Sequence, residues 1–224
     1  MYICEFSGLP GAGKSTLCLD VVKQLRAMGK TVVTLSEIKK YKNGKVIELV
    51  KALFCCKYFF FNMYAIFYAF AQAGLKESLS HAAGLILLNY KLQKVKTKNC
   101  YDYCIMEEGV IQYITSIPHA TNISKNFFLD KLLEQVLCIY GKINDIACEI
   151  SIDEVINRIR KRNNITTSRF DSQETPTLTN LLVVKGNNLR YVRSAIGQSM
   201  VLDMEMNYET LVCRVVEGIT KNER

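Results

Sequence analysis

The sequence contains little proline and little histidine, and each scarcity excludes a class of arrangement. Only three of the 224 residues are proline, so no proline-rich linker divides the chain. We find no low-complexity tract and no internal repeat, which excludes repeat architectures. A chain of this length is long enough for one sizeable domain and short for two, so we expect a single domain over residues 1–224.

Neither the histidines nor the cysteines form a metal-binding or disulfide pattern. His81 and His119 have no neighbours typical of a metal site or a catalytic triad, and we assign them no role. The nine cysteines include no CxxC pair, and most lie in apolar runs, where a free cysteine behaves as a small hydrophobic residue. This pattern predicts a reducing, cytoplasmic setting. The N-terminal "MYICEFSG" leads directly into a glycine-rich loop, so we also expect no cleavable signal peptide.

The formal net charge of +8 raises the question of an anionic partner. A solvated basic surface explains the charge most simply, and an anionic ligand such as a nucleotide is the functional alternative. Nucleic acid is a third candidate. The sequence has no recognisable helix-turn-helix, zinc finger or RNA-binding signature, so we expect no nucleic-acid partner.

Strand and helix patterns alternate along the chain. Apolar, β-branched strand patterns cover residues 2–7, 31–37, 101–109, 143–151 and 199–206, with helical patterns over 14–28, 45–98, 124–140, from 151 onward, 187–195 and 208–222. This alternation predicts an α/β fold, a three-layer P-loop NTPase architecture with a five-stranded parallel sheet flanked by helices. Ligands of such sheets bind at the carboxyl ends of the strands, where the motifs below fall.

The stretch "GLPGAGKST" lies between the first expected strand and a helix and matches GxxxxGK[ST], the Walker A phosphate-binding loop. Its backbone amides and the positive helix end would hold phosphates. Lys14 would reach the β- and γ-phosphates, and the Ser15 hydroxyl would bind Mg²⁺. The sequence therefore predicts a nucleoside triphosphate site with ATP and Mg²⁺ as cofactors. The nucleotide-binding residues that we expect are Gly8, Gly11, Ala12, Gly13, Lys14, Ser15 and Thr16.

Two carboxylates end the third expected strand, in "CIMEEG". A nucleotide-bound Mg²⁺ needs a carboxylate in its outer shell beside the phosphate loop, and Glu107 or Glu108 can supply it. The usual residue is Asp, so the role of each glutamate stays open. The pair also resembles motor-type ATPases, in which the second acid activates water. Two exposed loop glutamates without a role are the structural alternative.

Arginines gather after the fourth expected strand, in "NRIRKRNNITTSRFD". Arg158 and Arg162 are four residues apart and share a helix face, and the following loop brings Arg169. Arginines on a mobile lid stabilise the charge of a phosphoryl group in transfer. We therefore expect a lid at residues 158–172 with these three arginines in catalytic roles. A solvated basic helix end is the alternative.

These three motifs, in this order, resemble the small P-loop kinases, and most closely the thymidylate kinase and deoxyribonucleoside kinase group. The resemblance covers most of the chain in the order of its elements. It implies that the lid arginines contact the phosphates and that residues 45–98 form a helical insertion on the acceptor side. It also implies that the acid closing the second strand meets the acceptor, a position that Glu37 occupies here. An ordinary helix-start acid is the alternative for Glu37.

The acceptor half departs from that group. "EEG" replaces the Asp-Arg or Glu-Arg-Ser that usually follows the third strand, and Ile38 replaces the proline that often follows the acid of the second strand. The donor half is therefore similar and the acceptor half is not. For this reason we do not transfer a nucleoside or nucleotide acceptor to this chain from the resemblance alone.

Residues 53–74, "LFCCKYFFFNMYAIFYAFAQAG", are crowded with phenylalanine and tyrosine. They can form the core of an inserted helical pair, line an acceptor pocket, or make an interface such as a homodimer. Lys57, Asn62 and Gln72 interrupt the run, which argues against a membrane span of about 20 apolar residues. A peripheral membrane contact, assisted by the positive charge, is a further alternative.

Other phosphate-loop classes lack their motifs here. The sequence has neither the NKxD base motif of GTPases nor the LSGGQ motif of transporter ATPases. A kinase, a simpler ATPase and a regulatory nucleotide-binding protein remain. We favour an ATP- and Mg²⁺-dependent kinase acting on a small molecule, with a nucleoside or nucleotide as one candidate. Glu37 or Glu108 would accept the acceptor's proton, and Glu107 would hold Mg²⁺ through water together with Ser15.

Overall fold

The structure of the 224-residue chain is a computed structural model. It describes residues 1–40, 45–72, 74–98, 100–118, 121–123, 125–141, 143–161, 173–196 and 199–221. Arg162, Arg169 and His119 therefore lie outside the described residues, as do most of the expected lid and Ser124, the first residue of the expected helix 124–140.

A parallel sheet of five strands forms the centre of the described structure, in the order β2-β3-β1-β4-β5. The predicted fold class is confirmed. The chain leaves β1 toward β2 and leaves β4 toward β5, on opposite sides, so the crevice at the carboxyl ends of β1 and β4 is the expected ligand position. The strands are β1 (Tyr2–Gly8), β2 (Val32–Thr34), β3 (Tyr103–Met106), β4 (Asn144–Glu149) and β5 (Ser199–Asp203).

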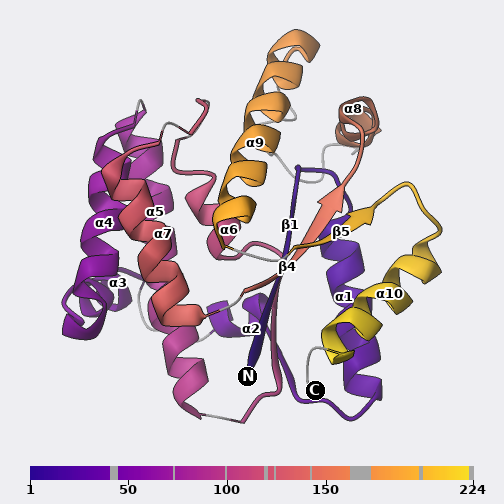
Figure 1. Ribbon diagram of the computed structural model, residues 1–224, viewed down its shortest axis with the longest axis horizontal. Coiled ribbons are helices and arrows are strands. Elements are labelled where there is room, and N and C mark those ends of the chain that lie inside the picture. The colour runs from indigo at the N-terminus through magenta and orange to yellow at the C-terminus, as the bar shows by residue number, and fades with distance from the viewer. Residues whose placement is uncertain are drawn as a thin grey trace.

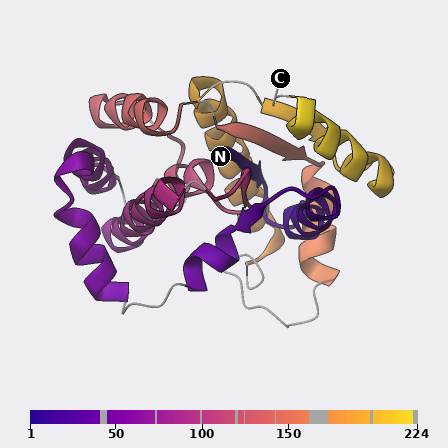
Figure 2. The same cartoon turned by 90° about the horizontal axis from the view of Figure 1, so that it is seen from below.

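Helices cover both faces of the sheet (Figures 1 and 2). The core between α1, α10 and the sheet includes Leu17, Leu25 and Leu211, and the core on the other face joins α4, α5, α6, α7 and α9. The helices are α1 (Lys14–Ala27), α2 (Leu35–Lys40), α3 (Lys45–Leu53), the 3₁₀ turn η1 (Cys56–Tyr58), α4 (Phe59–Phe70), α5 (Leu75–Lys98), α6 (Val110–Ile114), α7 (Phe127–Tyr140), α8 (Ile152–Lys161), α9 (Thr175–Ile196) and α10 (Tyr208–Lys221).

The central strand β1 alternates between the two cores, as the period of two in a β-strand requires. Cys4 and Phe6 pack in the core with α1 and α10, whereas Ile3 packs in the other core. Glu5 and Ser7 follow Ile3 at intervals of two, so both polar side chains point toward the face that α6 and α9 cover. Both are buried. This alternation places two polar groups inside the protein at the strand that leads to the phosphate loop.

Several element boundaries differ from the sequence-based expectation, and three of the differences are described here. β2 ends at Thr34 and α2 begins at Leu35, so Glu37 lies in the first turn of a helix and not at the end of a strand. α7 begins at Phe127, with Asn126 as its N-cap: the Leu129 amide donates to Asn126 Oδ1 at 2.8 Å. α9 begins at Thr175, twelve residues before the expected 187.

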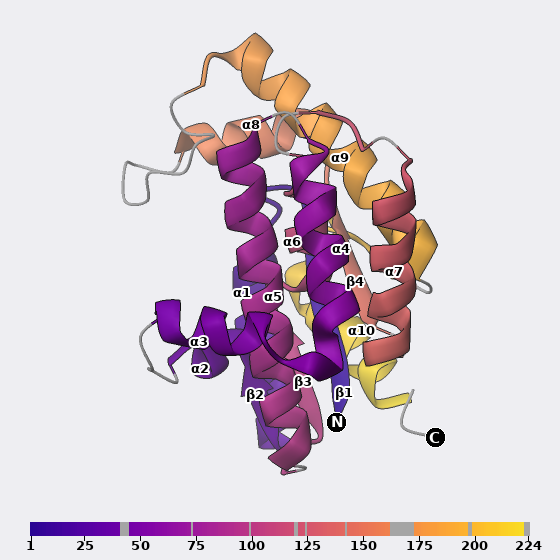
Figure 3. The same cartoon turned by 90° about the vertical axis from the view of Figure 1, so that its left-hand side faces the viewer.

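The segment 45–98 contains α3, η1, α4 and α5, in agreement with its helical pattern. Figure 3 shows α4 and α7 side by side at the outer surface, with α5 beside α4. In the part of the chain that the structure describes, no helix has the length and hydropathy needed to cross a membrane.

Candidate functional site

The phosphate loop joins the carboxyl end of β1 to the first turn of α1. Gly13 precedes the helix in a left-handed conformation, with φ of 88°, which a residue with a Cβ rarely adopts. The Lys14 ammonium curls back over the loop, where Nζ donates to the carbonyl oxygens of Gly8 at 3.1 Å and Leu9 at 2.8 Å. The loop therefore presents a helix N-terminus and a lysine ammonium together, an arrangement suited to phosphate. Of the predicted nucleotide-binding residues, Gly8 ends β1, and the others lie on this loop or at the start of α1: Gly11, Ala12, Gly13, Lys14, Ser15 and Thr16.

A cavity of about 590 Å³, which we call the Glu108 cavity, borders one side of the loop. Its walls come from the phosphate loop, from α5, from the segment that follows β3, and from α9. Ligand sites in proteins commonly enclose about 300–1,000 Å³, so this volume suits a small molecule. The lining residues are Pro10, Gly11, Lys14, Ser15, Ser80, His81, Gly84, Glu107, Glu108, Gln112, Tyr113, Ser116 and Lys185.

A second cavity of about 690 Å³, which we call the Arg158 cavity, borders the loop at Gly13 and Thr16. Its other walls come from α8, from the turn after β5 and from the start of α10. The two cavities share no lining residue, yet both border the phosphate loop. The remaining lining residues of the Arg158 cavity are Ser151, Asp153, Glu154, Asn157, Arg158, Met204, Glu205, Met206, Tyr208 and Leu211.

The structure brings the two glutamates after β3 to the wall of the Glu108 cavity. Glu107 is half-buried and Glu108 is exposed. Burial, together with the charge of Glu108, raises the pKa of the neighbouring Tyr113 hydroxyl above its ordinary value. Glu107, Glu108 and Lys14 therefore line the same cavity.

The oxygen atoms of Ser15 and Glu107 fit a magnesium ion that is held mainly by a nucleotide. Both residues line the Glu108 cavity beside Lys14. Among the described residues, no group of three or more His, Cys, Asp or Glu side chains could hold a metal by itself. A Mg²⁺ ion bound to phosphates needs only one or two protein oxygens, and hydroxyl and carboxylate oxygens are the types it prefers.

Glu37 is held by contacts at the start of α2, outside the lining of both cavities. Its carboxylate pairs with the Arg26 guanidinium at 2.8 Å and accepts a hydrogen bond from the Thr34 amide at 2.8 Å. Partial burial opposes the effect, but these hydrogen bonds hold the pKa of Glu37 below its ordinary value. Glu37 is not among the residues that line the Glu108 cavity or the Arg158 cavity. Its contacts are those of a helix-start acid.

Of the three predicted lid arginines, Arg158 is the one that the structure describes. Its Nε donates to Glu154 Oε1 at 2.8 Å, one turn earlier on α8. Its Nη1 lies close to the phosphate loop, 3.7 Å from where a Cβ on Gly13 would be. Arg158 thus reaches the loop from the Arg158 cavity, while the catalytic roles of Arg162 and Arg169 stay predictions outside the described residues.

Sequence reasoning missed several residues of the Glu108 cavity, of which Lys185 on α9 is the most informative. Lys185 is buried, and its Nζ donates to Thr115 Oγ1 at 2.9 Å and to Ser116 Oγ at 2.7 Å. A signal existed, because Lys185 occupies a position in the buried stripe of α9 at intervals of three and four. The other members of that stripe are Leu178, Leu182, Leu189, Val192 and Ile196. Ser80, His81, Gln112 and Tyr113 were missed as well.

The aromatic segment 53–74 divides between core and surface. α4 buries Phe61 and Tyr68, in agreement with the prediction of a helical core, but exposes Phe59, Phe60, Phe67 and Phe70. None of the residues that line the Glu108 cavity comes from this segment, so the hypothesis of an aromatic pocket finds no support there. The exposed rings instead continue onto α7. Successive ring contacts join Phe59, Phe60, Tyr64, Phe127, Phe128 and Phe67, with centroid distances of 5.3 to 6.5 Å.

Comparisons with known proteins give a likeness of fold at most. No protein-family model and no curated protein matches this chain. Among solved structures, the chain is similar to a deoxyadenosine kinase from M. mycoides with bound dATP, at a TM-score of 0.49 and 14% sequence identity. That alignment covers 98% of this chain and 100% of the kinase chain. A likeness of this size carries no argument about function, so the roles proposed below depend on the geometry of this chain.

Proposed function

We propose that the protein is an ATP- and Mg²⁺-dependent kinase that transfers the γ-phosphoryl group to a hydroxyl or phosphate of a small molecule. The observation that carries this proposal is that two cavities of about 590 and 690 Å³, the Glu108 cavity and the Arg158 cavity, border one phosphate loop. A donor nucleoside in the Arg158 cavity and an acceptor in the Glu108 cavity would have the triphosphate between them. A hydrolase needs room only for a water molecule, about 30 Å³, at the second position.

The loop residues would act on the donor. The amides at the start of α1 and the Lys14 ammonium bind the phosphates and offset their charge as the phosphoryl group leaves. Ser15 and Glu107 would hold the magnesium ion, which when bound neutralises charge on the phosphate oxygens. Arg158 contributes positive charge beside Gly13, and Arg162 and Arg169 would join it from the lid at 158–172.

Glu108 is the residue that we propose as the general base. Its carboxylate is exposed within the cavity that would hold the acceptor, whereas Glu37 is held by Arg26. A general base has to lie within hydrogen-bond reach of the proton that it accepts. A hydroxyl acceptor bound beside Glu108 and the loop satisfies this condition.

The test is turnover of purified protein with ATP, Mg²⁺ and a panel of small hydroxyl and phosphate acceptors. Formation of a phosphorylated acceptor that Lys14→Ala abolishes supports the proposal, because the variant lacks the ammonium at the phosphates. Turnover that is unaffected by Lys14→Ala overturns it. ATP hydrolysis that is independent of any acceptor and lost in Glu108→Gln would instead favour the alternative function, an ATPase.

We also propose that the exposed rings of α4 and α7 form a contact surface, for a second copy of the chain or for a membrane surface. Phe59, Phe60 and Phe127 are each more than half exposed. Monomeric proteins rarely leave more than a few hundred Å² of contiguous apolar surface uncovered. Light-scattering mass and flotation with liposomes separate the two partners, and a monomer that binds no liposomes contradicts both.

A further inference from the structure

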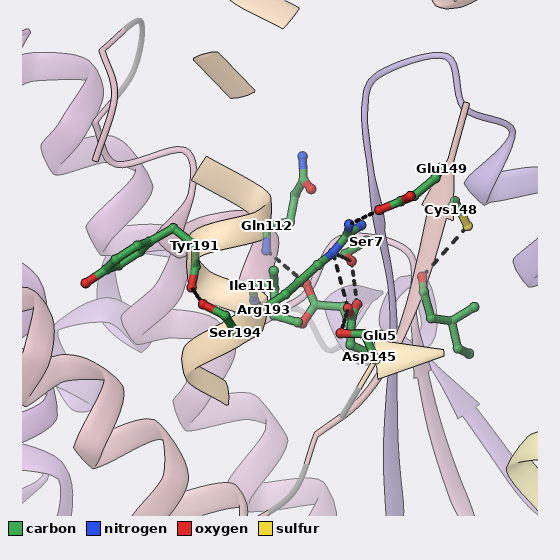
Figure 4. Close-up of polar contacts among 12 residues, drawn as sticks. Glu5, Ser7, Ile111, Gln112, Asp145, Cys148, Glu149, Tyr191, Arg193 and Ser194 are labelled. Atoms are coloured by element: carbon green, nitrogen blue, oxygen red, sulfur yellow. Dashed lines mark hydrogen bonds and ion pairs between the residues drawn. The ribbon is translucent and has the colours of Figure 1, made fainter. Parts of the chain in front are cut away.

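Strand β1 carries an acid that is completely buried, Glu5. Its carboxylate accepts three backbone hydrogen bonds from the start of α6. Figure 4 shows Glu5 beside Ile111 and Gln112. The Gly109 and Gln112 amides donate to Oε1 at 3.0 and 2.9 Å, and the Ile111 amide donates to Oε2 at 3.0 Å. The first amides of a helix have no partner within the helix, so a side chain of the central strand caps α6 from a distance of more than 100 residues in sequence.

We propose that Glu5 is a positioning residue that fixes the segment 107–116 to the sheet and so holds Glu107 and Glu108 at the cavity. This inference rests on the proposed function, because it assigns those two glutamates to phosphoryl transfer. Five lining residues of the Glu108 cavity lie in that one segment: Glu107, Glu108, Gln112, Tyr113 and Ser116. Any displacement of the segment would therefore move much of the cavity wall at once.

The two ends of the segment are held by different contacts. Lys185 binds the hydroxyls of Thr115 and Ser116, and Ser78 Oγ donates to the Ile117 carbonyl oxygen at 2.6 Å. Those contacts fix the end that leaves the cavity. Glu5 binds at the other end, at the Gly109 amide directly after Glu108. Of these contacts, it therefore lies nearest in sequence to the two carboxylates and does most to fix their position.

Gly109 provides an observation that is independent of the hydrogen bonds. A Cβ on Gly109 would lie 2.5 Å from Glu5 Oε2 and 2.8 Å from Met106 Cε. Atoms do not approach that closely without displacement, so only glycine lets the chain pass this near to the carboxylate. The glycine of "EEG", which departs from the resembled kinases, thus has a structural reason in Glu5.

Among the described residues, Glu5 has few other partners for its charge. Burial raises the pKa of Glu5 to about 7, and the amides of Gln112 and Ile111 act in the opposite direction. Asp145 on β4 adds a like charge, but the Arg193 guanidinium on α9 lies 3.2 Å from Asp145 Oδ2. Burial raises the pKa of the Tyr140 hydroxyl on α7, and the negative charge of Glu5 contributes to the same increase. The amides at the start of α6 are therefore the groups that solvate this carboxylate.

Glu5→Gln tests the inference with little change in shape. The amide keeps one acceptor oxygen and places an NH₂ group where the other oxygen accepted a hydrogen bond. At a pH well above the Glu5 pKa of about 7, where the wild-type carboxylate is ionised, we expect hydrogen exchange at the Gly109, Ile111 and Gln112 amides to become about ten-fold faster or more, since bonds to charged groups are the strong ones. With the acceptor that the wild type uses, kcat should fall about ten-fold or more, while the KM for ATP stays within about three-fold because the phosphate loop is unchanged.

A matched control is Glu48→Gln. Glu48 is also buried and pairs with Lys91 at 3.0 Å, between α3 and α5 and outside the cavity lining. This variant should leave the three exchange rates and kcat unchanged, even where it lowers overall stability. A purely structural role for Glu5 would make the two variants alike.

Gly109→Ala disturbs the same contact, because the added Cβ would lie too close to the Glu5 carboxylate. It should reproduce the Glu5→Gln pattern, so the test can still be made if Glu5→Gln does not fold. Unchanged exchange at Gly109, Ile111 and Gln112, or unchanged kcat, in a folded Glu5→Gln protein overturns the inference. If the wild type phosphorylates no acceptor, the proposed function fails, and the exchange rates still decide whether Glu5 anchors the segment.

Discussion

Two neighbouring strands, β2 and β3, each lead into a segment with a glutamate, and the two segments differ in what binds the acid. After β2, Glu37 is tied to Arg26 and to the Thr34 amide at the start of α2. After β3, Glu107 and Glu108 line a cavity beside Lys14, and the anchoring role falls to Glu5 from β1. The first acid is therefore engaged at the start of its own helix, whereas the turn that carries the other two is held by a third acid.

The segment after β3 is also closer to the phosphate loop than the segment after β2. β3 pairs directly with β1, so residues that follow it emerge beside the loop that follows β1. β2 pairs with the far side of β3 and is one strand more distant. Because the carboxyl ends of parallel strands share one edge, this order alone favours Glu107 and Glu108 over Glu37.

Of the substitutions at these three glutamates, Glu108→Gln should lower the activity most. Loss of a general base typically lowers the rate by 10²- to 10⁴-fold, and we expect kcat for phosphoryl transfer to fall by roughly that factor. Binding of ATP, measured by calorimetry, should change little because Glu108 does not lie on the phosphate loop. Full transfer activity in Glu108→Gln would remove it from the mechanism.

Glu107→Gln should have a smaller effect that appears in the magnesium dependence. A residue that holds a metal through water typically contributes about 10- to 100-fold in metal affinity. We expect the Mg²⁺ concentration for half-maximal transfer to rise by about that factor, with partial recovery of kcat at high Mg²⁺. The same magnesium titration for the variant and the wild type would contradict this role.

Glu37→Gln should have the smallest effect, and on stability more than on activity. We expect kcat within about two-fold of the wild type and a loss in the free energy of unfolding of under about 1 kcal/mol, since both members of the pair with Arg26 are partly exposed. The pKa of Glu37 is lowered in the folded state, so its stabilisation is present at neutral pH and is lost as the pH falls below the ordinary carboxyl range. Urea unfolding at neutral and acidic pH measures this.

Arg26→Gln is the matched control for that pair and should give a similarly small loss of stability. Loss of a general base lowers kcat by about two orders of magnitude or more. A Glu37→Gln protein that folds normally but has a kcat reduced by that factor would contradict this prediction and assign the general base to Glu37.

Much of the fold was predictable because its signals are local. Apolar strands, the glycine-rich loop and the helical periodicity each depend on neighbours in sequence, and they predicted the parallel sheet and the position of "GLPGAGKST". The start of α9 was missed because the polar stretch that ends in "QETPT", residues 173–177, reads as a loop. In the structure Pro176 lies in the first turn of α9, a position that a helix tolerates.

The candidate site was less predictable because its contacts cross long distances in sequence. Glu5 meets Gly109, and Lys185 meets Ser116, and neither pair shares a motif. The sequence does contain one signal for such residues, which is a single charged residue within an apolar strand or within the buried stripe of a helix. Such a charge predicts that a partner exists but does not say which residue supplies it.

The most direct measurement is a crystal structure with a non-hydrolysable ATP analogue and Mg²⁺. We expect the nucleoside in the Arg158 cavity, the phosphates on the loop with Lys14, and the γ-phosphate facing the Glu108 cavity. A nucleoside that occupies the Glu108 cavity, and so leaves no room there for an acceptor, would contradict it.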